Sequence, residues 1–233
     1  MLRAHDPIEG TLDVSVIIPT LNAARQLPAT MAACGGVGET IVVDGGSTDE
    51  TVAMGRKLGA RIVTSEPGRG IQLRAGAAAA AGSWLLFLHA DTSLSEEWRR
   101  VVREFTTNPA HHLRAATFRF ALDDPSPAAR RLERWVAWRV RHFGLAYGDQ
   151  GLLIHRDLYA SLGGFRAWPL MEDVDLMRRI GRRRLTVLAA TATTSAERWR
   201  RDGWRRRSAR NLGCLTLYFL GVPPRLIARL YAR

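Results

Sequence analysis

Four apolar runs of strand length alternate with segments of helix length over the first 91 residues, and this alternation limits the fold more than any other feature. The runs are rich in Val, Ile and Leu: VSVIIP (14–19), TIVVD (40–44), ARIVT (60–64) and SWLLFLHAD (83–91). Strands of this kind are buried on both faces, as in a parallel sheet covered by helices. The sequence therefore predicts an α/β fold with a mostly parallel sheet flanked by helices.

The segments between and after these runs carry helix and turn signals. STDETVAMGRKLG (47–59) begins with three candidate capping residues, Ser47, Thr48 and Asp49. Further along we expect a strand over 114–120, an amphipathic helix over 128–143 and a Gly-rich loop, YGDQG (147–151).

Composition and cysteine usage favour one cytoplasmic domain. The 233 residues, 46% of them apolar, are enough to bury one sizeable core. Cys34 and Cys214 lack any CxxC or His-rich partner motif, so we expect neither a zinc site nor a disulfide framework. The N-terminal stretch lacks the apolar core of a signal peptide, and no run reaches the roughly 18 apolar residues of a spanning helix.

Positive charge is concentrated toward the C-terminus. The net charge is +12, and residues 178–233 hold 15 arginines against two acidic residues, whereas residues 1–177 hold 19 basic and 20 acidic residues. Such a cluster favours phosphate, nucleic acid or an anionic membrane as partner.

An apolar stretch adjoins the basic cluster. RWRRDGWRRRSAR (198–210) precedes NLGCLTLYFLGV (211–222), and three arginines then recur every fourth residue, Arg225, Arg229 and Arg233. This order suits an interfacial helix and predicts peripheral contact with the inner face of the cell membrane. The alternative is that 211–222 packs on the main domain or forms a homodimer contact.

Polar side chains follow three of the predicted strands. The first strand continues into Pro19-Thr20-Leu21-Asn22, the second ends in Asp44, and the fourth ends in His89-Ala90-Asp91. Ligands of parallel α/β sheets bind at the carboxyl ends of the strands, although each carboxylate could instead cap the following helix. The turn after the first strand, PTLNAA, has no glycine, and the chain has no Gly-Lys-Ser/Thr motif, so dinucleotide and P-loop sites are excluded.

Six stretches, in this order and spacing, resemble the family 2 nucleotide-sugar glycosyltransferases of GT-A fold, in particular a small bacterial subgroup of single-domain enzymes. They are VSVIIPTLNAA, IVVDGGSTDET, GRGIQLRAGA, WLLFLHADT, YGDQGLLIHR and LMEDVDLMRRI. The resemblance implies a catalytic domain over 13–200, followed by a basic, amphipathic helical extension over 201–233. It also implies transfer of a sugar from a nucleoside-diphosphate sugar to an acceptor hydroxyl or carboxyl with inversion. Because some members glycosylate membrane lipids such as carotenoid acids, a lipid acceptor is one candidate.

The resemblance assigns roles to individual residues. Donor contacts would come from Pro19, Thr20, Asn22, Asp44, Ser47, Asp49, Arg69, Gln72, Asp91 and Arg198. Asp173 matches the general base, and Glu172 would bond the acceptor or a backbone amide. Asp149, Gln150 and Trp199 would border the acceptor, although a tight structural turn explains GDQG (148–151) equally well.

Metal use is implied by Asp91, which matches the aspartate that holds Mg²⁺ or Mn²⁺ on the donor diphosphate. His89 replaces the first aspartate of that motif; it ligates the metal, bonds a phosphate or only closes the strand. Of the signature of processive members only Arg198-Trp199 is present, so long polymer synthesis is not expected. The alternative function is a non-catalytic nucleotide- or nucleic-acid-binding α/β protein that uses its basic C-terminal segment, but that leaves the acidic residues unexplained.

Overall fold

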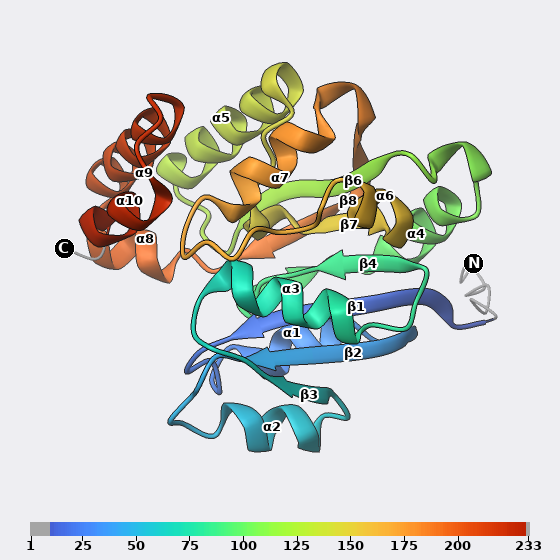
Figure 1. Cartoon of the computed structure of the whole chain (residues 1–233). Helices are drawn as coiled ribbons and strands as arrows, with labels where there is room; N and C mark the ends of the chain where they lie inside the picture. The colour runs from blue at the N-terminus through green and yellow to red at the C-terminus, as the bar shows by residue number, and fades with distance from the viewer. Residues whose placement is uncertain (1–9, 232–233) are drawn as a thin grey trace, which may run out of the picture.

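The computed structural model describes residues 10–231 and contains an eight-stranded sheet in the order β3-β2-β1-β4-β7-β6-β8-β5 (Figure 1). The strands are β1 (Leu12–Thr20), β2 (Val37–Asp44), β3 (Arg61–Thr64), β4 (Trp84–Phe87), β5 (Thr92–Leu94), β6 (Ala115–Leu122), β7 (Leu152–His155) and β8 (Leu185–Thr194). The α-helices are α1 (Leu27–Ala33), α2 (Thr51–Lys57), α3 (Arg69–Ala79), α4 (Trp98–Thr106), α5 (Pro127–Phe143), α6 (Arg156–Ser161), α7 (Glu172–Ile180), α8 (Glu197–Asp202), α9 (Trp204–Phe219) and α10 (Pro224–Tyr231).

The four predicted apolar runs form one parallel half of this sheet. β1 pairs with β2 and β4, and β2 pairs with β3, all in parallel. The other half is mixed, because β7 runs antiparallel to both β4 and β6 while β6 and β8 are parallel. The short β5 closes that edge antiparallel to β8. The predicted parallel, helix-flanked α/β fold is therefore confirmed for the first half, and the sheet as a whole is mixed.

Two hydrophobic clusters cover opposite faces of the sheet, which explains why the strand sequences do not alternate. Successive β1 residues divide between them: Ile17 lies in one cluster, and Val16 and Ile18 lie in the other. Helix α3 approaches the first face closely, since a Cβ on Gly76 would lie 2.4 Å from Cγ2 of Ile17. Burial on both faces is what the apolar runs predict.

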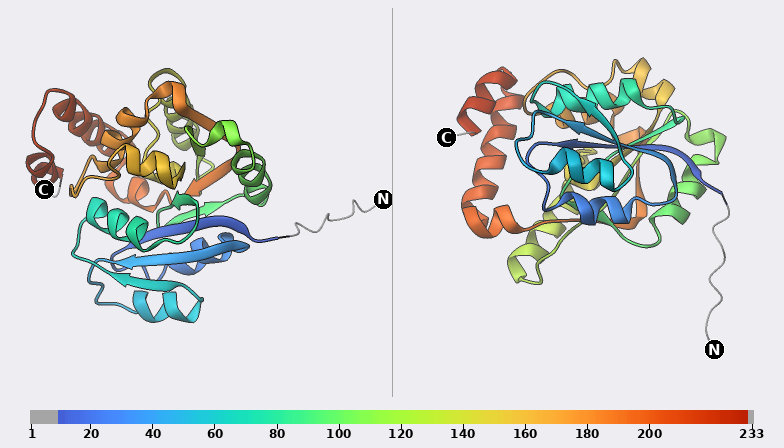
Figure 2. Two further views of the ribbon diagram at one scale, coloured as in Figure 1. Left: turned by 45° about the vertical axis from the view of Figure 1, so that its right-hand side comes forward. Right: turned by 90° about the horizontal axis from the view of Figure 1, so that it is seen from below.

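The three C-terminal helices, α8 to α10, stand beyond the ends toward which β1 and β2 point (Figures 1 and 2). Cys214 of α9 and Ile227 of α10 belong to the larger hydrophobic cluster, so the segment 211–222 packs on the rest of the chain through one face. Its other face leaves Leu212, Phe219 and Leu220 exposed. Arg225 and Arg229 are exposed, and Arg233 lies outside the described residues. None of the helices described is both long and apolar enough to cross a bilayer.

Candidate active site

A crevice opens at the carboxyl ends of β1 and β4, where the sequence predicts a ligand site. This strand-end crevice has a volume of about 320 Å³. It is lined by eight of the predicted residues: Pro19, Thr20, Asn22, Arg69, Gln72, His89, Asp91 and Arg198. They come from three separate stretches of the α/β half and from α8, so the fold brings together residues that lie far apart in the sequence.

Gln72 holds the floor of the crevice. Its side chain is almost fully buried, and its Nε2 donates to the carbonyl oxygens of Thr20 (2.7 Å) and Val43 (2.9 Å). The amide thus joins the ends of β1 and β2 to the first turn of α3. Only a glycine fits easily at Gly45, where a Cβ would lie 3.0 Å from Nε2 of Gln72 and 3.3 Å from Cα of Pro67.

Three predicted donor residues, Asp44, Ser47 and Asp49, do not line the strand-end crevice. Asp44 is 3% exposed and accepts hydrogen bonds from the backbone N–H groups of Gly46 (3.0 Å) and Ser47 (2.9 Å). Ser47 Oγ also accepts from the backbone N–H of Asn22 (2.8 Å). Their polar atoms are used inside the loop, so these side chains shape the crevice instead of facing it.

In the structure, α2 begins later in the chain than the capping signals predict. The helix begins at Thr51, and none of Ser47, Thr48 and Asp49 is its N-cap residue. Asp49 nevertheless accepts hydrogen bonds from the backbone N–H groups of Thr51 and Ala24, both 3.1 Å long. The hydroxyl of Thr51 and these N–H groups lower the pKa of the Asp49 carboxyl. Asp49 therefore ties α2 to the loop after β1, which is a structural role.

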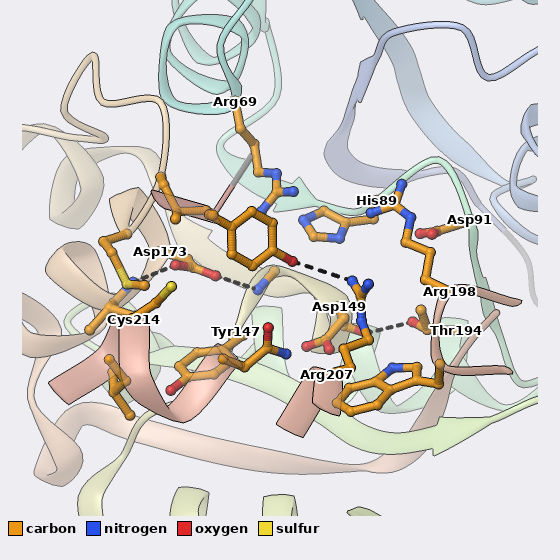
Figure 3. Close-up of a pocket in the computed structure, with 18 of the residues that line it drawn as sticks. Arg69, His89, Asp91, Tyr147, Asp149, Asp173, Thr194, Arg198, Arg207 and Cys214 are labelled. Carbon is orange, nitrogen blue, oxygen red and sulfur yellow. Dashed lines mark hydrogen bonds between the residues drawn. The ribbon is translucent and has the colours of Figure 1, made fainter. Parts of the chain in front are cut away.

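A second cavity, of about 190 Å³, adjoins the crevice and is called the central cavity here (Figure 3). The two share Arg69, His89, Asp91 and Arg198, together with Ser195. The far side of the central cavity is built by Tyr147, Gly148 and Asp149 from the loop before β7, by Asp173, and by α9 and α10. The crevice and the cavity therefore meet at Asp91.

Asp173 and Glu172 differ sharply although they are adjacent. Asp173 lines the central cavity, and its Oδ2 accepts a hydrogen bond from the backbone N–H of Gly148 (3.1 Å; Figure 3). Glu172 is 0% exposed, lines neither cavity and has no hydrogen-bond partner for either carboxylate oxygen. Its contact is with Nη1 of Arg69, at 3.6 Å. Glu172 is thus withdrawn from both cavities, and its predicted bond to the acceptor or to a backbone amide stays a prediction.

Burial sets the protonation of Glu172. Desolvation, reinforced by the neighbouring charge of Asp173 and opposed by Arg69, raises the pKa of Glu172 to about 7. The preceding residue, Met171, has a φ of 67°, an uncommon conformation for a side-chain-bearing residue. Glu172 and Asp173 follow as the first two residues of α7, and successive side chains of a helix point about 100° apart, so the two carboxylates meet different surroundings.

The GDQG turn also divides its two predicted residues. Asp149 lines the central cavity, and its Oδ1 is buried without a hydrogen-bond partner. Burial, opposed by Arg139 and reinforced by Asp173, raises the pKa of Asp149 to about 6. Gln150 is 2% exposed and donates from Nε2 to the Phe118 carbonyl oxygen (3.2 Å), so it is a structural residue and not a cavity residue.

The residues around Asp91 fit a divalent cation shared with a diphosphate. Within residues 10–231 no group of three or more His, Cys, Asp or Glu side chains is placed to hold a metal alone. Mg²⁺ is, however, commonly bound by one or two carboxylates plus substrate phosphates. Nε2 of His89 is buried without a partner, and burial, reinforced by Arg69 and Arg198, lowers the pKa of this imidazole well below its usual value. His89 thus contributes a neutral imidazole where the two cavities meet, with Nε2 packed against Gly148.

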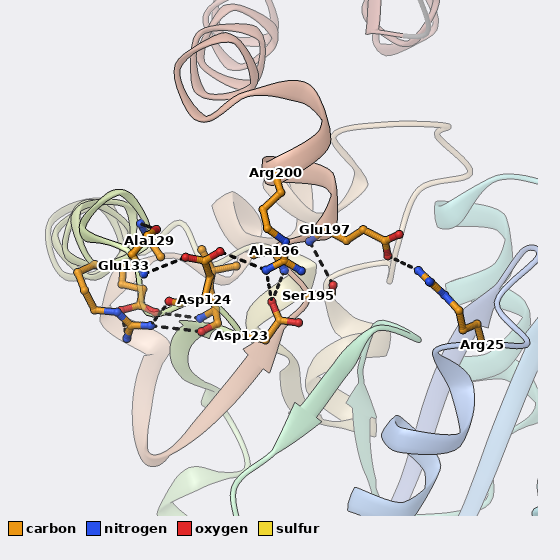
Figure 4. A network of polar contacts seen from close by, with 12 residues as sticks. Arg25, Asp123, Asp124, Ala129, Glu133, Ser195, Ala196, Glu197 and Arg200 are labelled. Carbon is orange, nitrogen blue, oxygen red and sulfur yellow. Dashed lines mark hydrogen bonds and ion pairs between the residues drawn. The ribbon is translucent and has the colours of Figure 1, made fainter.

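A polar network holds α8 against the sheet and so places Arg198 and Trp199 (Figure 4). The backbone N–H of Ala196 donates to Asp123 (2.6 Å), and Nη1 of Arg200 donates to Asp124 (3.1 Å). Glu197 pairs with Arg25 across the mouth of the crevice. Because α8 is fixed from both sides, Arg198 faces the strand-end crevice and Trp199 lines the central cavity.

Several cavity residues were not predicted from the sequence. Gly148 lies in the predicted GDQG turn but had no role of its own: a Cβ there would lie 2.3 Å from Nε2 of His89, so only glycine allows this packing. Tyr147 precedes it in the quoted YGDQG stretch, which was the available signal. Arg207 and Tyr231 come from α9 and α10, and Nη2 of Arg207 donates to the Tyr231 hydroxyl (3.4 Å). No local motif marks these two residues.

Comparison with known proteins identifies the class. The sequence profile described as glycosyl transferase family 2 matches residues 15–163, more than half of the chain, so the chain belongs to this family. This membership favours a transferase over the non-catalytic alternative. The predicted GT-A fold is likewise confirmed by the solved structures that resemble it.

Individual relatives match over part of their length. A PGL/p-HBAD biosynthesis glycosyltransferase of Mycobacterium bovis is 44% identical over 94 residues, covering 35% of this chain and 36% of that protein. An uncharacterized glycosyltransferase of Mycobacterium tuberculosis is 37% identical over 82 residues, covering 35% and 38%. The matched part thus spans little more than a third of these curated relatives.

Solved structures share the fold at low sequence identity. The mannosyltransferase PcManGT from Pyrobaculum calidifontis, in complex with GDP-Man and Mn²⁺, superposes with a TM-score of 0.66 at 19% identity, covering 88% of this chain and 63% of that one. Glucosyl-3-phosphoglycerate synthase from Mycobacterium tuberculosis, in complex with Mn²⁺, UDP and glucosyl-3-phosphoglycerate, gives 0.52 at 21% identity, covering 80% and 71%. At these identities the likeness is one of fold.

Proposed function

We propose that this enzyme transfers a sugar from a nucleoside-diphosphate sugar to an acceptor hydroxyl with inversion, and that Asp173 is the general base. The observation that carries the proposal is the position of Asp91, which lines both the strand-end crevice and the central cavity. A donor in the crevice would place its sugar at this junction, with its diphosphate beside Asp91. An acceptor in the central cavity would then lie between the sugar and Asp173.

The donor half of the proposal rests on charge. Arg69 and Arg198 flank the crevice, and a guanidinium pairs well with phosphate oxygens. Asp91, with His89 as second protein ligand, would hold Mg²⁺ or Mn²⁺; the bound ion would supply charge stabilisation for the leaving diphosphate. The neighbours solved with GDP-Man and Mn²⁺ or with UDP and Mn²⁺ support this choice of donor and metal.

The reaction is a single displacement. The acceptor oxygen forms a bond to the anomeric carbon as the bond from that carbon to the diphosphate oxygen breaks, and the nucleoside diphosphate leaves with the electron pair. Asp173 takes the proton of the acceptor hydroxyl, a contribution on the order of 10²- to 10⁴-fold in rate. The Gly148 N–H, bound to Oδ2 of Asp173, fixes the carboxylate while it does so.

The remaining predicted residues take supporting roles in the proposal. Pro19, Thr20, Asn22 and Gln72 shape the nucleotide pocket, and the loop held by Asp44, Ser47 and Asp49 borders it. Asp149 and Trp199 border the acceptor. The domain division at residue 200 is kept only as a sequence boundary, because α9 and α10 complete the central cavity.

Donor binding tests the proposal directly. Thermal-shift and calorimetric titrations with UDP-, GDP- and TDP-sugars, each with and without Mn²⁺, should show one nucleotide class binding in a metal-dependent way. Asp91→Asn should weaken that metal-dependent binding, whereas Asp157→Asn, an exposed aspartate on α6, should leave it unchanged. Metal-independent binding, or equal binding in Asp91→Asn, contradicts the metal assignment.

A further inference from the structure

A groove of about 510 Å³ lies between α5 and α9, outside the two cavities described above. Its volume falls within the roughly 300–1,000 Å³ of small-molecule sites. The walls of this α5–α9 groove are largely apolar and aromatic, with Trp135, Trp138 and Phe143 on α5 and Leu212 and Phe219 on α9. The groove is therefore large enough and apolar enough to bind part of an organic molecule.

The inner end of the groove opens toward the reaction centre. Tyr147, Asp149, Trp199, Asn211 and Leu215 line both the groove and the central cavity. Three of the five polar residues of the groove wall, Tyr147, Asp149 and Asn211, are among these shared residues, while Ser208 is the polar residue of a mostly apolar outer part. Arg139 also lines the groove, but its guanidinium lies over the Tyr147 ring (3.6 Å to the centroid) and Nε donates to the Leu145 carbonyl oxygen.

The outer rim is exposed in the described structure. Trp135 and Trp138 stack on each other (centroids 4.8 Å apart) yet remain 49% and 44% exposed, and Leu212 and Phe219 face them from α9 at 55% and 51%. Large exposed apolar side chains that gather in one place mark binding surfaces. The rim therefore needs a partner with apolar surface.

The charges around the rim choose between a second copy of the chain and a lipid-like molecule. Arg131 on α5 and Arg205 on α9 are exposed, and both line a hollow that shares Trp135 and Leu212 with the groove. A symmetric dimer through this face would bring the same arginines of two copies together, because an isologous interface uses one patch twice. An amphiphile in an anionic membrane meets the same arginines with opposite charge.

We propose that the α5–α9 groove binds the hydrocarbon part of an amphiphilic acceptor, with the acceptor hydroxyl reaching the central cavity past Asp149. The groove wall is mostly apolar at the rim and more polar where it joins the central cavity. These two parts match the hydrocarbon and hydroxyl ends of such a molecule. This inference rests on the proposed function, since it assigns the acceptor class of the same site. It also gives a function to α9. This helix lies outside the α/β half of the molecule and lines both the central cavity and the groove.

Binding of a matched pair of phenols tests the groove without any turnover. In a titration followed by tryptophan fluorescence, 4-octylphenol should bind at least about tenfold more tightly than phenol, because its alkyl chain leaves water. Leu212→Gln should weaken 4-octylphenol binding about tenfold and leave phenol binding unchanged. Leu113→Gln, the same change at a leucine that is 68% exposed and outside the groove, is the matched control.

Donor titration in the same variants separates this inference from the proposed function. If the parent binds no nucleotide sugar, the proposed function fails whatever the phenols do; if donor binding is normal but 4-octylphenol binds parent and Leu212→Gln equally, the groove assignment is overturned. Trp138→Gln provides a second variant, with circular dichroism to check folding. A dimer in sedimentation equilibrium that Leu212→Gln dissociates would also overturn the inference, since a second copy would then occupy the groove.

Discussion

Adjacent carboxylates in the segment Glu172-Asp173 illustrate how surroundings decide chemistry at the scale of single residues. Glu172 is buried and forms an ion pair with Arg69, whereas Asp173 faces the central cavity and is fixed by the Gly148 N–H. A base must reach the proton that it removes, so geometry selects Asp173. Glu172 instead places a buried carboxyl group next to the guanidinium of Arg69.

Asp173→Asn should lower the transfer rate by about 10² to 10⁴ while donor affinity stays within about twofold of the parent, because the amide keeps the shape but accepts no proton. Initial rates and donor calorimetry on the same preparation measure the two effects. Asp157→Asn is the control at an exposed position. Normal turnover in Asp173→Asn would show that the base assignment is wrong.

Glu172 should make stability depend on pH. Its pKa is raised to about 7 in the fold, above the ordinary value of 4.5, so the folded chain binds more protons than the unfolded chain between these values. The contribution of Glu172 is then fully present below about pH 4.5 and is lost as the pH rises through about 7. Asp149 and His89 also titrate differently in the fold, so the informative quantity is the difference between parent and Glu172→Gln. Denaturant unfolding at pH 5 and pH 8 should show a smaller loss of stability in Glu172→Gln; an equal loss would contradict the raised pKa.

Gly148→Ala should disturb the site through two contacts at once. The new Cβ would lie 2.3 Å from Nε2 of His89, and a shift of the turn would weaken the hydrogen bond to Asp173. Overpacking of this kind costs about 1–3 kcal/mol. We expect a lower melting temperature together with loss of transfer. Gly213→Ala on α9, where a Cβ would contact nothing within 4 Å, is the control. Equal activity in the two variants would show that the turn tolerates the shift.

The residues at strand ends were predictable, but their partners were not. The apolar runs fix where β1 and β4 end, so Thr20 and Asp91 could be placed at the crevice from the sequence. Whether Asp44 and Gln150 face a cavity depends on loop conformation. Their side chains form hydrogen bonds with backbone N–H and carbonyl groups, and no sequence pattern shows where those groups lie. Sequence patterns thus predict where a residue lies in the fold better than whether its side chain faces a cavity.

At the scale of elements, α10 closes one side of the central cavity. Tyr231 lines the cavity, receives a hydrogen bond from Arg207, and its ring lies 4.6 Å from the Arg210 guanidinium carbon. Ile227 of the same helix is fully buried in the main cluster. The helix therefore contributes both core packing and a cavity wall.

Removing α10 by truncation after Val222 should affect acceptor and donor differently. The loss of buried Ile227 lowers stability by roughly 2–5 kcal/mol, the range for deleting a large core side chain. Donor affinity should stay near that of the parent in chains that remain folded, since no residue of α10 lines the strand-end crevice. Tyr231→Phe, which keeps the ring and loses only the bond from Arg207, is the milder companion variant. Equal losses of donor and acceptor binding would contradict this division.

At the scale of the whole molecule, the sequence predicted one half of the sheet better than the other. β1 to β4 follow one another with short crossovers, so local pattern and chain order suffice. The other half depends on pairings between distant segments, such as β5 with β8 and β6 with β8. The basic segment was visible from composition, yet its contribution to the cavity through Arg207 required the three-dimensional structure.

The positive charge of the C-terminal helices predicts reversible binding to anionic membranes. Arg205 and Arg206 are exposed on α9, and Arg205 lines a hollow that shares Trp135 and Leu212 with the α5–α9 groove. Each basic residue near anionic lipid contributes about 1 kcal/mol, so replacing both with Gln should weaken vesicle binding about thirtyfold at low salt. Arg56→Gln with Lys57→Gln on α2 removes the same charge far from this face (Figure 1) and should leave binding nearly unchanged.

Co-sedimentation with vesicles of graded anionic lipid content measures this binding. The bound fraction should rise with anionic lipid and fall as salt shortens the screening length from about 30 Å at 0.01 M to about 8 Å at 0.15 M. Because apolar contacts are little affected by such salt, any binding that remains reports the aromatic rim, and Trp135→Gln should remove it. Protein that stays in the supernatant at low salt, or equal partition of the α9 and α2 double variants, would show that the arginines of α9 serve another purpose and that the acceptor reaches the groove from solution.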